Sequence, residues 1–570
     1  MQEPRIGLAL SGGGFRASIF HLGVILRLEE LGIMPRVDVI SAVSGGSIVS
    51  AYYVVEMERR LGEGREEIRE GRPLSEVRVE IFRDIARDFF KATDHNLRSR
   101  ALVFFPFYHP IATLKMLRTR YNRSDAMQAE YDRWFYRGES LDQLPSPENR
   151  HKGEPCSYLF GPKLILNTTS LLTGRRVGYS REPISGLNEL STINTNVLPL
   201  SRIVGASAGV PVLFPPTFVS GDMLVDGGVT DNQGLEALWQ EEKDRAFDVL
   251  LVSDASGQME LIHRMSSSGM KTLSRTNTIF QFQSRKKVLD RLVRWRNEER
   301  DRRRFAFVHL HLNLKDRSKV RCRVPSEYIP AIARIRTDLD QFSFVEREAL
   351  MYHGYTLMDG QLKKYCPDLI EDSKRLVASE GVVDRPAVAP LFRKRESDRD
   401  EKAMIEKREE MKRILGAGSR SVFLARAAKR HGAKAIAWVA LTWALPLLLF
   451  FVFIYGSVKT FAEQVVEKML GGWLSSAVPG WLADLWPRLK EYIASPLTLQ
   501  GLTILAAFTV LAYMLAFITY VVMRSFVRRW DLAAYRRLAG AAEPDVVWSE
   551  DDHGESGKRG KKEEEKEKIL

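Results

Sequence analysis

The sequence of 570 residues has little cysteine and only ten histidines, and its first apolar run is short. Its three cysteines, Cys156, Cys322 and Cys366, form no Cys-x-x-Cys pair, which argues against a disulfide scaffold and against a cysteine zinc site. The first apolar run is too short for a signal peptide. We therefore expect the N-terminal part of the chain to stay in the cytoplasm.

Charge is present in both signs, with only a modest excess of bases. The chain has 85 Lys and Arg against 72 Asp and Glu, which gives a net charge of +13. That balance suits an anionic partner, such as nucleic acid or an anionic membrane surface. A hydrophobic content of 45% excludes a wholly disordered chain, and the length allows several domains of roughly 150 residues.

The C-terminal third contains two long stretches without charge, residues 435–458 and 502–523. Each is long enough to cross a hydrocarbon core of ~30 Å as a helix. Residues 415–434 hold five bases and no acid, residues 524–537 hold five arginines, and the connecting loop 459–494 is balanced in charge. The positive-inside rule then predicts a two-span membrane protein with its N-terminal domain and C-terminus in the cytoplasm.

The predicted domain organisation follows from these composition changes. Residues 1–380 are expected to form the N-terminal domain, and residues 381–434 a charged linker and juxtamembrane helix. Residues 435–523 form the transmembrane hairpin. Residues 524–570 form a basic segment that ends in a low-complexity tail of alternating Lys and Glu.

The first 60 residues predict a strand-loop-helix-strand-turn-helix unit. The strands are expected at residues 6–10 and 37–41, and the helices at 18–31 and 48–61. A crossover helix of this length makes the two strands parallel. Both glycine-rich turns then lie at the carboxyl edge of one sheet, where open α/β folds bind their ligands.

Residues 11–17, the glycine loop, allow three interpretations. The run of three glycines could simply form a turn. Gly12-x-Gly14-x-x-Ala17 also fits a loose dinucleotide fingerprint, and Asp38 follows at about the right distance. Glycine amides at a helix N-terminus could instead hold a developing oxyanion.

The second turn favours the third interpretation. Ser44 lies between a strand and a helix, with small residues before it and Gly45 and Gly46 after it. This is the pattern of a nucleophile elbow, which presents a serine hydroxyl at a helix N-terminus. The first glycine of the usual elbow is replaced by Ala42. A dinucleotide site has no use for such an elbow.

A serine nucleophile needs a base, and the histidines do not supply an obvious one. His309 and His311 alternate on a predicted strand over residues 305–314, and His21 and His263 lie on a helix and in a polar loop.

Asp226 is the better candidate for the base. It ends a short apolar strand and precedes Gly227 and Gly228, which let the backbone approach another turn closely. Burial would raise the pKa of an aspartate and let it take the serine proton directly. Taken alone, the Asp-Gly sequence is also a hairpin signal.

Together, residues 11–17, 42–46 and 226–228 resemble the patatin-like phospholipases. The Ser-Gly-Gly-Gly-x-Arg form of the loop also resembles the cytosolic group IV phospholipases. Residues 166–175 and 205–216 resemble further segments of the family. The resemblance covers about residues 5–255 and implies a three-layer α/β/α domain with a central, mostly parallel sheet.

The resemblance also implies roles for individual residues. Ser44 would be the nucleophile and Asp226 the general base, with no metal and no cofactor. The remaining implied roles are the oxyanion hole at Gly12, Gly13 and Gly14, pairing with lipid phosphate or loop bracing at Arg16, and turn support at Gly45, Gly46, Gly227 and Gly228.

The predicted function is hydrolysis of fatty-acyl esters of phospholipids or lysophospholipids at a bilayer, without nucleic acid as a partner. Acyl transfer to another alcohol stays open chemically. The alternatives are a catalytically silent patatin domain that acts as a membrane scaffold or lipid sensor and, less favoured, a dinucleotide-binding oxidoreductase.

Two further segments remain ambiguous from sequence. Residues 285–304 could form a basic helix that faces anionic headgroups, or a solvated helix that packs on the core. The aromatic cluster in residues 104–108 could line an acyl groove or belong to the core.

Overall fold

The computed structural model describes most of the N-terminal two thirds of the chain and one long C-terminal helix. The described residues are 3–63, 72–103, 105–111, 113, 115, 119, 121–145, 161–182, 198–211, 213–242, 245–257, 269–314, 323–376, 387–393, 401–420, 423–432 and 496–540.

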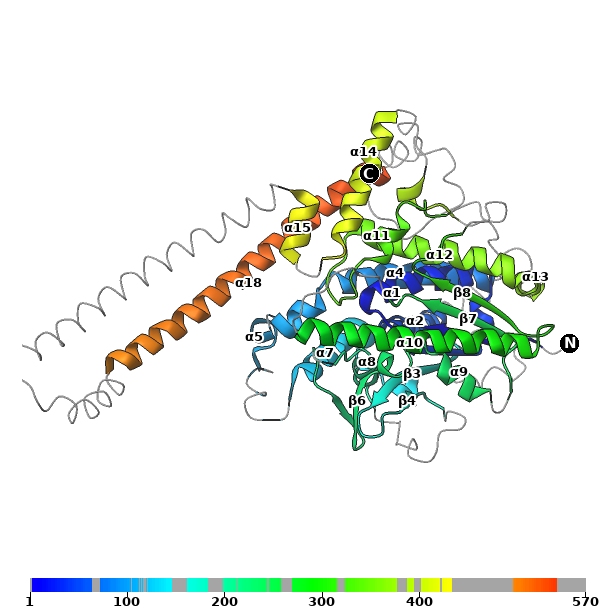
Figure 1. Ribbon diagram of the computed structural model, residues 1–570, viewed down its shortest axis with the longest axis horizontal. Helices are drawn as coiled ribbons and strands as arrows, with labels where there is room; N and C mark the ends of the chain where they lie inside the picture. The colour runs from blue at the N-terminus through cyan, green and yellow to red at the C-terminus, as the bar shows by residue number, and fades with distance from the viewer. Residues whose placement is uncertain are drawn as a thin grey trace, which may run out of the picture. The chain divides into compact units, whose positions relative to one another are not determined.

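A single mixed sheet forms the centre of the N-terminal part (Figure 1). Its strands are β1 (Ile6–Leu10), β2 (Val39–Val43), β3 (Lys163–Ser170), β4 (Arg176–Tyr179), β5 (Thr217–Val219), β6 (Asp222–Asp226), β7 (Val249–Asp254) and β8 (Arg304–His309). The order is β5-β6-β3-β2-β1-β7-β8, with β4 also paired to β3. Strands β3, β2, β1, β7 and β8 run parallel, and β4, β5 and β6 add antiparallel pairs at one side. The predicted central, mostly parallel sheet is confirmed.

Helices cover both faces of this sheet. The helices of this part are α1 (Gly14–Glu30), α2 (Gly45–Glu63), α4 (Leu74–Thr93), α5 (Phe105–Tyr108), α7 (Arg123–Tyr131), α8 (Leu200–Ser207), α9 (Leu235–Glu241), α10 (Gly269–Glu298), α11 (Ile329–Ala333), α12 (Phe344–Tyr365), α13 (Pro367–Leu376) and α14 (Glu401–Ala417). Two further helices, α15 (Phe423–His431) and α18 (Pro496–Ala539), are described with the second unit below. Leu8 and Leu10 of β1 join the cluster under α1 and α12, whereas Ala9 joins the cluster under α9 and α10. Successive strand residues point to opposite faces, so this alternation makes three layers, with α10 and α12 on opposite sides of the sheet in Figure 1.

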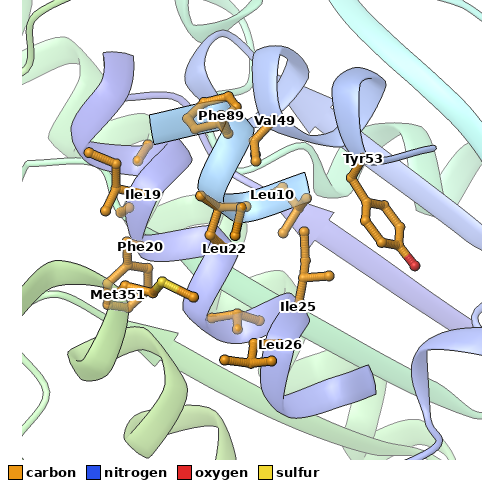
Figure 2. Packing of buried hydrophobic residues seen from close by; sticks show 14 of the residues in the cluster. Leu10, Ile19, Phe20, Leu22, Ile25, Leu26, Val49, Tyr53, Phe89 and Met351 are labelled. Atoms are coloured by element: carbon orange, nitrogen blue, oxygen red, sulfur yellow. The ribbon is translucent and has the colours of Figure 1, made fainter. Parts of the chain in front are cut away.

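The larger of the two apolar clusters surrounds α1. Figure 2 shows Ile19, Phe20 and Ile25 of this helix packed with Leu10 of β1 and Met351 of α12. The packing around α1 is close enough that several of its small residues touch neighbouring backbone, since a Cβ on Gly23 would overlap the Met351 carbonyl. The α1 helix therefore holds the glycine loop, which leads directly into it, against the domain core.

The N-terminal unit has the predicted order, but its second strand, β2, runs over Val39–Val43 and so lies two residues later than the predicted 37–41. Strand β1 is where it was expected, and it pairs in parallel with β2. Helices α1 and α2 begin directly at the glycine turns, at Gly14 and Gly45, a few residues earlier than the apolar pattern indicated. The strand predicted over residues 305–314 ends at His309 in β8, because the chain turns there with a Leu312 N–H bond to the His309 carbonyl.

The ambiguous basic segment forms the second half of α10. Its apolar side chains Val288, Leu292 and Trp295 are buried on the sheet with α9. Arg291 lies over the Trp239 ring and pairs with Glu236 at 2.8 Å. Of the two interpretations, the structure therefore has the helix that packs on the core through these apolar side chains. Of the aromatic cluster, residue 104 lies outside the described part, and Phe107 and Tyr108 are half-buried near α5.

The chain divides into two compact units, residues 1–421 with 534–570 and residues 422–533. The first unit includes α14, whose side chains Met411, Ile414 and Leu415 are buried. In the second unit, Arg430 and His431 of α15 both pair with Asp531 of α18, at 3.2 Å and 3.0 Å.

The two predicted membrane spans require correction. The first, residues 435–458, and the loop 459–494 lie outside the described residues, as does the tail 551–570. The second falls in α18, but no helix of the described residues is both long enough and apolar enough to span a membrane. The prediction of a two-span membrane protein is therefore wrong.

Candidate active site

Three turns meet at the carboxyl edge of the parallel strands. Residues 11–17 follow β1, Ser44 follows β2, and Asp226 ends β6, which pairs with β3. The first two turns touch, because a Cβ on Gly12 would lie 3.2 Å from Cβ of Ser44. A Cβ on Gly45 would overlap the Gly14 carbonyl oxygen, so only glycine at position 45 allows this approach.

Ser44 occupies a strained elbow between β2 and α2. Its φ of 50° lies in the left-handed region that residues other than glycine rarely adopt. Its backbone N–H donates to Oγ of Ser207 at 3.0 Å, and its carbonyl accepts from the Ile48 N–H at the start of α2. The strain is therefore held by hydrogen bonds on both sides of the residue, which is common at functional sites.

Hydrogen bonds fix both the backbone and the carboxylate of Asp226. Its N–H donates to the Gly209 carbonyl, and its own carbonyl accepts from the Thr169 hydroxyl at 3.0 Å. Carboxylate Oδ1 accepts from the Gly228 N–H at 2.7 Å. These bonds place the carboxylate at the end of β6, with the following short 3-10 turn wrapped around it.

Ser44 and the Asp226 carboxylate lie on two sides of the Asn232 side-chain oxygen. That oxygen adjoins Gly12, where a Cβ would also meet Ser44, and Gly228, where a Cβ would also meet Asp226 Oδ1. Ser44 and Asp226 are almost covered, with 5% of each residue exposed. Burial raises the pKa of Asp226 to about 6, although the bond from the Gly228 N–H opposes that shift. The carboxylate is thus ionised at neutral pH and is a stronger base than an ordinary aspartate.

The three glycine amides of the loop differ in their partners. The Gly12 N–H donates to the Asn232 carbonyl at 3.0 Å and is engaged. The amides of Gly13 and Gly14, with φ of 139° and 57°, have no hydrogen-bond acceptor among the described residues. These two donors, beside Ser44, are the ones placed to receive an oxyanion.

Arg16 is buried with 4% exposure. Its guanidinium donates to the carbonyls of Ile335 and Ala255 at 2.7 Å and 2.9 Å, and more weakly to Ala333. These contacts tie the start of α1 to two segments far away in sequence. Arg16 therefore braces the glycine loop.

The glycines that flank the dyad lie in close contacts. A Cβ on Gly46 would overlap the Leu10 carbonyl, and one on Gly227 would overlap the Asn167 carbonyl. A Cβ on Gly228 would crowd both Asn232 and Asp226. The two turns therefore approach neighbouring backbone as tightly as the sequence pattern indicated.

Of the histidines that the sequence offered, His21 contacts the glycine loop and His309 ends a strand. His21 is buried, with Nδ1 2.7 Å from Ser253 Oγ, and its Nε2 donates to the Ser11 carbonyl. Burial lowers its pKa to about 4, so the ring is neutral. His309 ends β8, and burial lowers its pKa to about 4 as well. His263 lies outside the described residues.

Sequence analysis missed the role of Ser207 and Asn232. The Ser207 hydroxyl accepts from the Ser44 N–H, donates to the Asn167 carbonyl at 2.6 Å and lies 2.8 Å from Ser47 Oγ. Asn232 bridges the glycine loop and the turn after Asp226. Both residues lie in segments that carry the family resemblance, but no spacing rule connects them to Ser44.

Comparison with known families matches residues 8–239 to the patatin-like phospholipases. The match starts in β1 and ends in α9, and so includes the glycine loop, the elbow and Asp226. Residues 8–239 form a patatin-like phospholipase domain. Within this patatin-like domain, Ser44 and Asp226 lie at the turns described above.

Two solved structures are also similar to the chain. VipD from Legionella pneumophila matches with 13% identity and a TM-score of 0.27, over 97% of this chain and 93% of that one. Human GIVD cytosolic phospholipase A2, in complex with methyl gamma-linolenyl fluorophosphonate, matches with 12% identity and a TM-score of 0.37. That match covers 66% of this chain and 60% of the human chain. Family membership of residues 8–239 supports lipid acyl hydrolase activity, whereas these two likenesses are too weak to add to it.

Proposed function

We propose that the protein hydrolyses fatty-acyl esters of phospholipids or lysophospholipids through an acyl-serine intermediate. The observation that carries the proposal is the buried Asp226 carboxylate, whose pKa is raised to about 6, in the same cluster of turns as the strained elbow at Ser44. A serine becomes a nucleophile when an adjacent base takes its proton. Here the base is a carboxylate, and no histidine takes part.

Acylation begins when Ser44 Oγ attacks the ester carbonyl carbon and its proton moves to Asp226. The carbonyl oxygen becomes an oxyanion, and the amides of Gly13 and Gly14 stabilise it. When the intermediate collapses, the bond to the leaving oxygen breaks, and the proton on Asp226 passes to that oxygen. The lysophospholipid or alcohol leaves, and the acyl group remains on Ser44.

Deacylation repeats these steps with water. Asp226, ionised again, takes a proton from a water molecule that attacks the acyl carbonyl. The proton then returns to Ser44 Oγ as the fatty acid leaves. Arg16 acts as a positioning residue in both halves, since it fixes the glycine loop that carries the two amides.

The energetic cost of the site argues against a silent scaffold. A buried, ionised carboxylate destabilises a fold, and so does a serine whose backbone lies in the left-handed region. Such features cluster at sites where they serve a reaction. The dinucleotide hypothesis receives no support, because Ser44 crowds the loop where a pyrophosphate would approach.

The proposed substrates reach the protein from a bilayer or a micelle. Large apolar side chains are exposed on segments that lie close to Asp226 in the fold, at Leu171, Leu172, Val210, Leu213, Phe218 and Val229. Gly209, next to Val210, accepts the Asp226 N–H, and the Leu171 N–H donates to Met223 of β6. Exposed apolar groups of this kind can contact lipid tails at an interface.

The proposal is tested with detergent-purified full chain on a short-chain reporter ester and on mixed phospholipid vesicles, without added calcium. Wild type should release fatty acid and react with a fluorophosphonate probe. Ser44→Ala should do neither, while Ser50→Ala, a buried serine on the same helix, should behave as wild type. Wild type that hydrolyses nothing and is not labelled would refute the proposal.

A further inference from the structure

One face of α10 is exposed along most of the helix, whereas the opposite face packs on the sheet. Val288, Leu292 and Trp295 form the packed face. On the exposed face, pairs of neighbouring side chains recur every seven residues, which is close to two turns of an α-helix. Its members, called the α10 face from here on, are Ile279, Phe280, Lys286, Lys287, Val293 and Arg294.

Part of the α10 face is apolar. Phe280 is 68% exposed, Val293 50% and Ile279 39%. Apolar area that stays in water is unfavourable, and groups of such side chains mark contact surfaces. A partner that covers the α10 face must therefore offer it apolar groups.

The rest of the α10 face is basic. Lys286, Lys287 and Arg294 are exposed, and none of them forms an ion pair with another residue in the described part of the chain. One acid, Asp290, lies among these three bases, so the charge of the face stays positive. A surface with such an excess of positive charge attracts an anionic partner.

The helix brings this face to the edge of the sheet where the candidate active site lies. Arg285 pairs with Asp254, the last residue of β7, at 2.6 Å, so α10 is level with the carboxyl edge there. The chain enters β8 after α10, so the helix runs back from that edge along the sheet (Figure 1). Phe280 lies more than one turn before Arg285, which places it ~7 Å past the edge at the usual rise per residue. The α10 face therefore begins beyond the edge that holds Ser44.

We propose that the α10 face binds the surface of an anionic phospholipid bilayer. Phe280 and Ile279 contact the acyl chains below the headgroups, and the three bases contact the anionic headgroups. A nucleic acid would attract the same bases, but a bilayer also supplies the apolar partner that the exposed side chains lack. The inference goes beyond the proposed function, because binding at the α10 face needs no cleavage of an ester.

The test measures cosedimentation of the full chain with phosphatidylcholine vesicles, prepared with and without phosphatidylserine. Ser44→Ala serves as the parent protein, so that no lipid is consumed. The parent should bind the phosphatidylserine vesicles more tightly, and added salt should weaken that binding. Each base at an anionic surface contributes about fivefold to the affinity, so replacing Lys286, Lys287 and Arg294 together by Gln should weaken binding about a hundredfold.

A matched control and an apolar variant separate the two parts of the α10 face. The control replaces three exposed bases on the opposite side of the sheet by Gln and should bind as the parent does; these are Arg87, Lys91 and Lys364. Phe280→Ala should weaken binding about tenfold and keep its dependence on salt, because the variant loses only apolar contact. All of the substituted side chains are exposed, so each variant should unfold at the Tm of the parent.

Several results would overturn the inference. They are equal binding with and without phosphatidylserine, an α10 variant without the three bases that binds as the parent does, and a control variant that loses as much affinity. Binding of a DNA duplex through the same bases, without binding of vesicles, would overturn it in favour of nucleic acid. Hydrolysis of the reporter ester by wild type is measured separately, so failure of the proposed function and failure of this inference give different results.

Discussion

Replacing Asp226 by Asn should abolish hydrolysis and at the same time stabilise the fold near neutral pH. The change keeps the size of the side chain, and the amide oxygen can still accept the Gly228 N–H. It removes a negative charge that is buried with 5% exposure and has no cation among the groups that shift its pKa. The variant therefore loses the base and also loses the cost of burying it.

The size of the gain follows from the pKa of Asp226. It rises from 3.8 to about 6 on folding, so the native state holds the proton more tightly than the unfolded state does. Stability therefore falls as pH rises through that interval, and the ionised carboxylate costs ~3 kcal/mol at pH 7. At pH 5 the same linkage between pKa and stability gives an unfolding free-energy cost of roughly half that size.

The assay is urea unfolding of wild type and Asp226→Asn, followed by tryptophan fluorescence at pH 7.5 and pH 5. We expect the variant to be the more stable at pH 7.5, by up to ~3 kcal/mol, and its advantage to shrink at pH 5. Asp222→Asn, at the other end of β6, is the matched control and should keep hydrolysis. A variant that is less stable than wild type at pH 7.5, or a difference that does not depend on pH, would refute the reasoning.

The same pKa predicts the activity of wild type, which should fall below pH 6 and retain about a tenth of its plateau at pH 5, as measured by initial rates on the reporter ester. Gly45→Ala should slow fluorophosphonate labelling strongly, since its Cβ overlaps the glycine loop, whereas Gly62→Ala on the same helix meets nothing within 4 Å and should label normally. Arg16→Lys should lower Tm by thermal unfolding and lower activity equally on neutral esters and phospholipids; a defect confined to phospholipids would point to phosphate recognition instead. Ser207→Ala leaves the Ser44 N–H unpaired and should slow labelling about tenfold, while Ser201→Ala on the same helix should not.

The membrane prediction shows how composition can mislead when it is used alone. Two uncharged stretches predicted two spans, yet no helix among the described residues is both long enough and apolar enough to span a membrane. In α18 the chain continues as one helix from apolar residues into an arginine-rich stretch, and Asp531 within it pairs with Arg430 and His431 of α15. A hydropathy pattern depends only on the order of residues along the chain. It does not show which side chains of a helix form ion pairs or pack against other segments.

The sequence by itself determined the local elements around the site. Strands and turns depend mainly on residues that are neighbours in the sequence. The apolar run therefore predicts β1, the small residues around Ser44 predict the elbow, and the glycines after Asp226 predict the turn. The order of two parallel strands joined by a helix also follows from the sequence, because the crossover leaves only one arrangement.

Only the tertiary structure decided which distant groups meet. Ser44 and Asp226 come together because β6 pairs with β3 and β3 with β2, and no local pattern encodes that pairing. The direction of Arg16 and the bonds of Ser207 depend likewise on contacts between remote segments. The raised pKa of Asp226 is the plainest case, since it comes from burial, which is a property of the packed domain and of no single stretch of sequence.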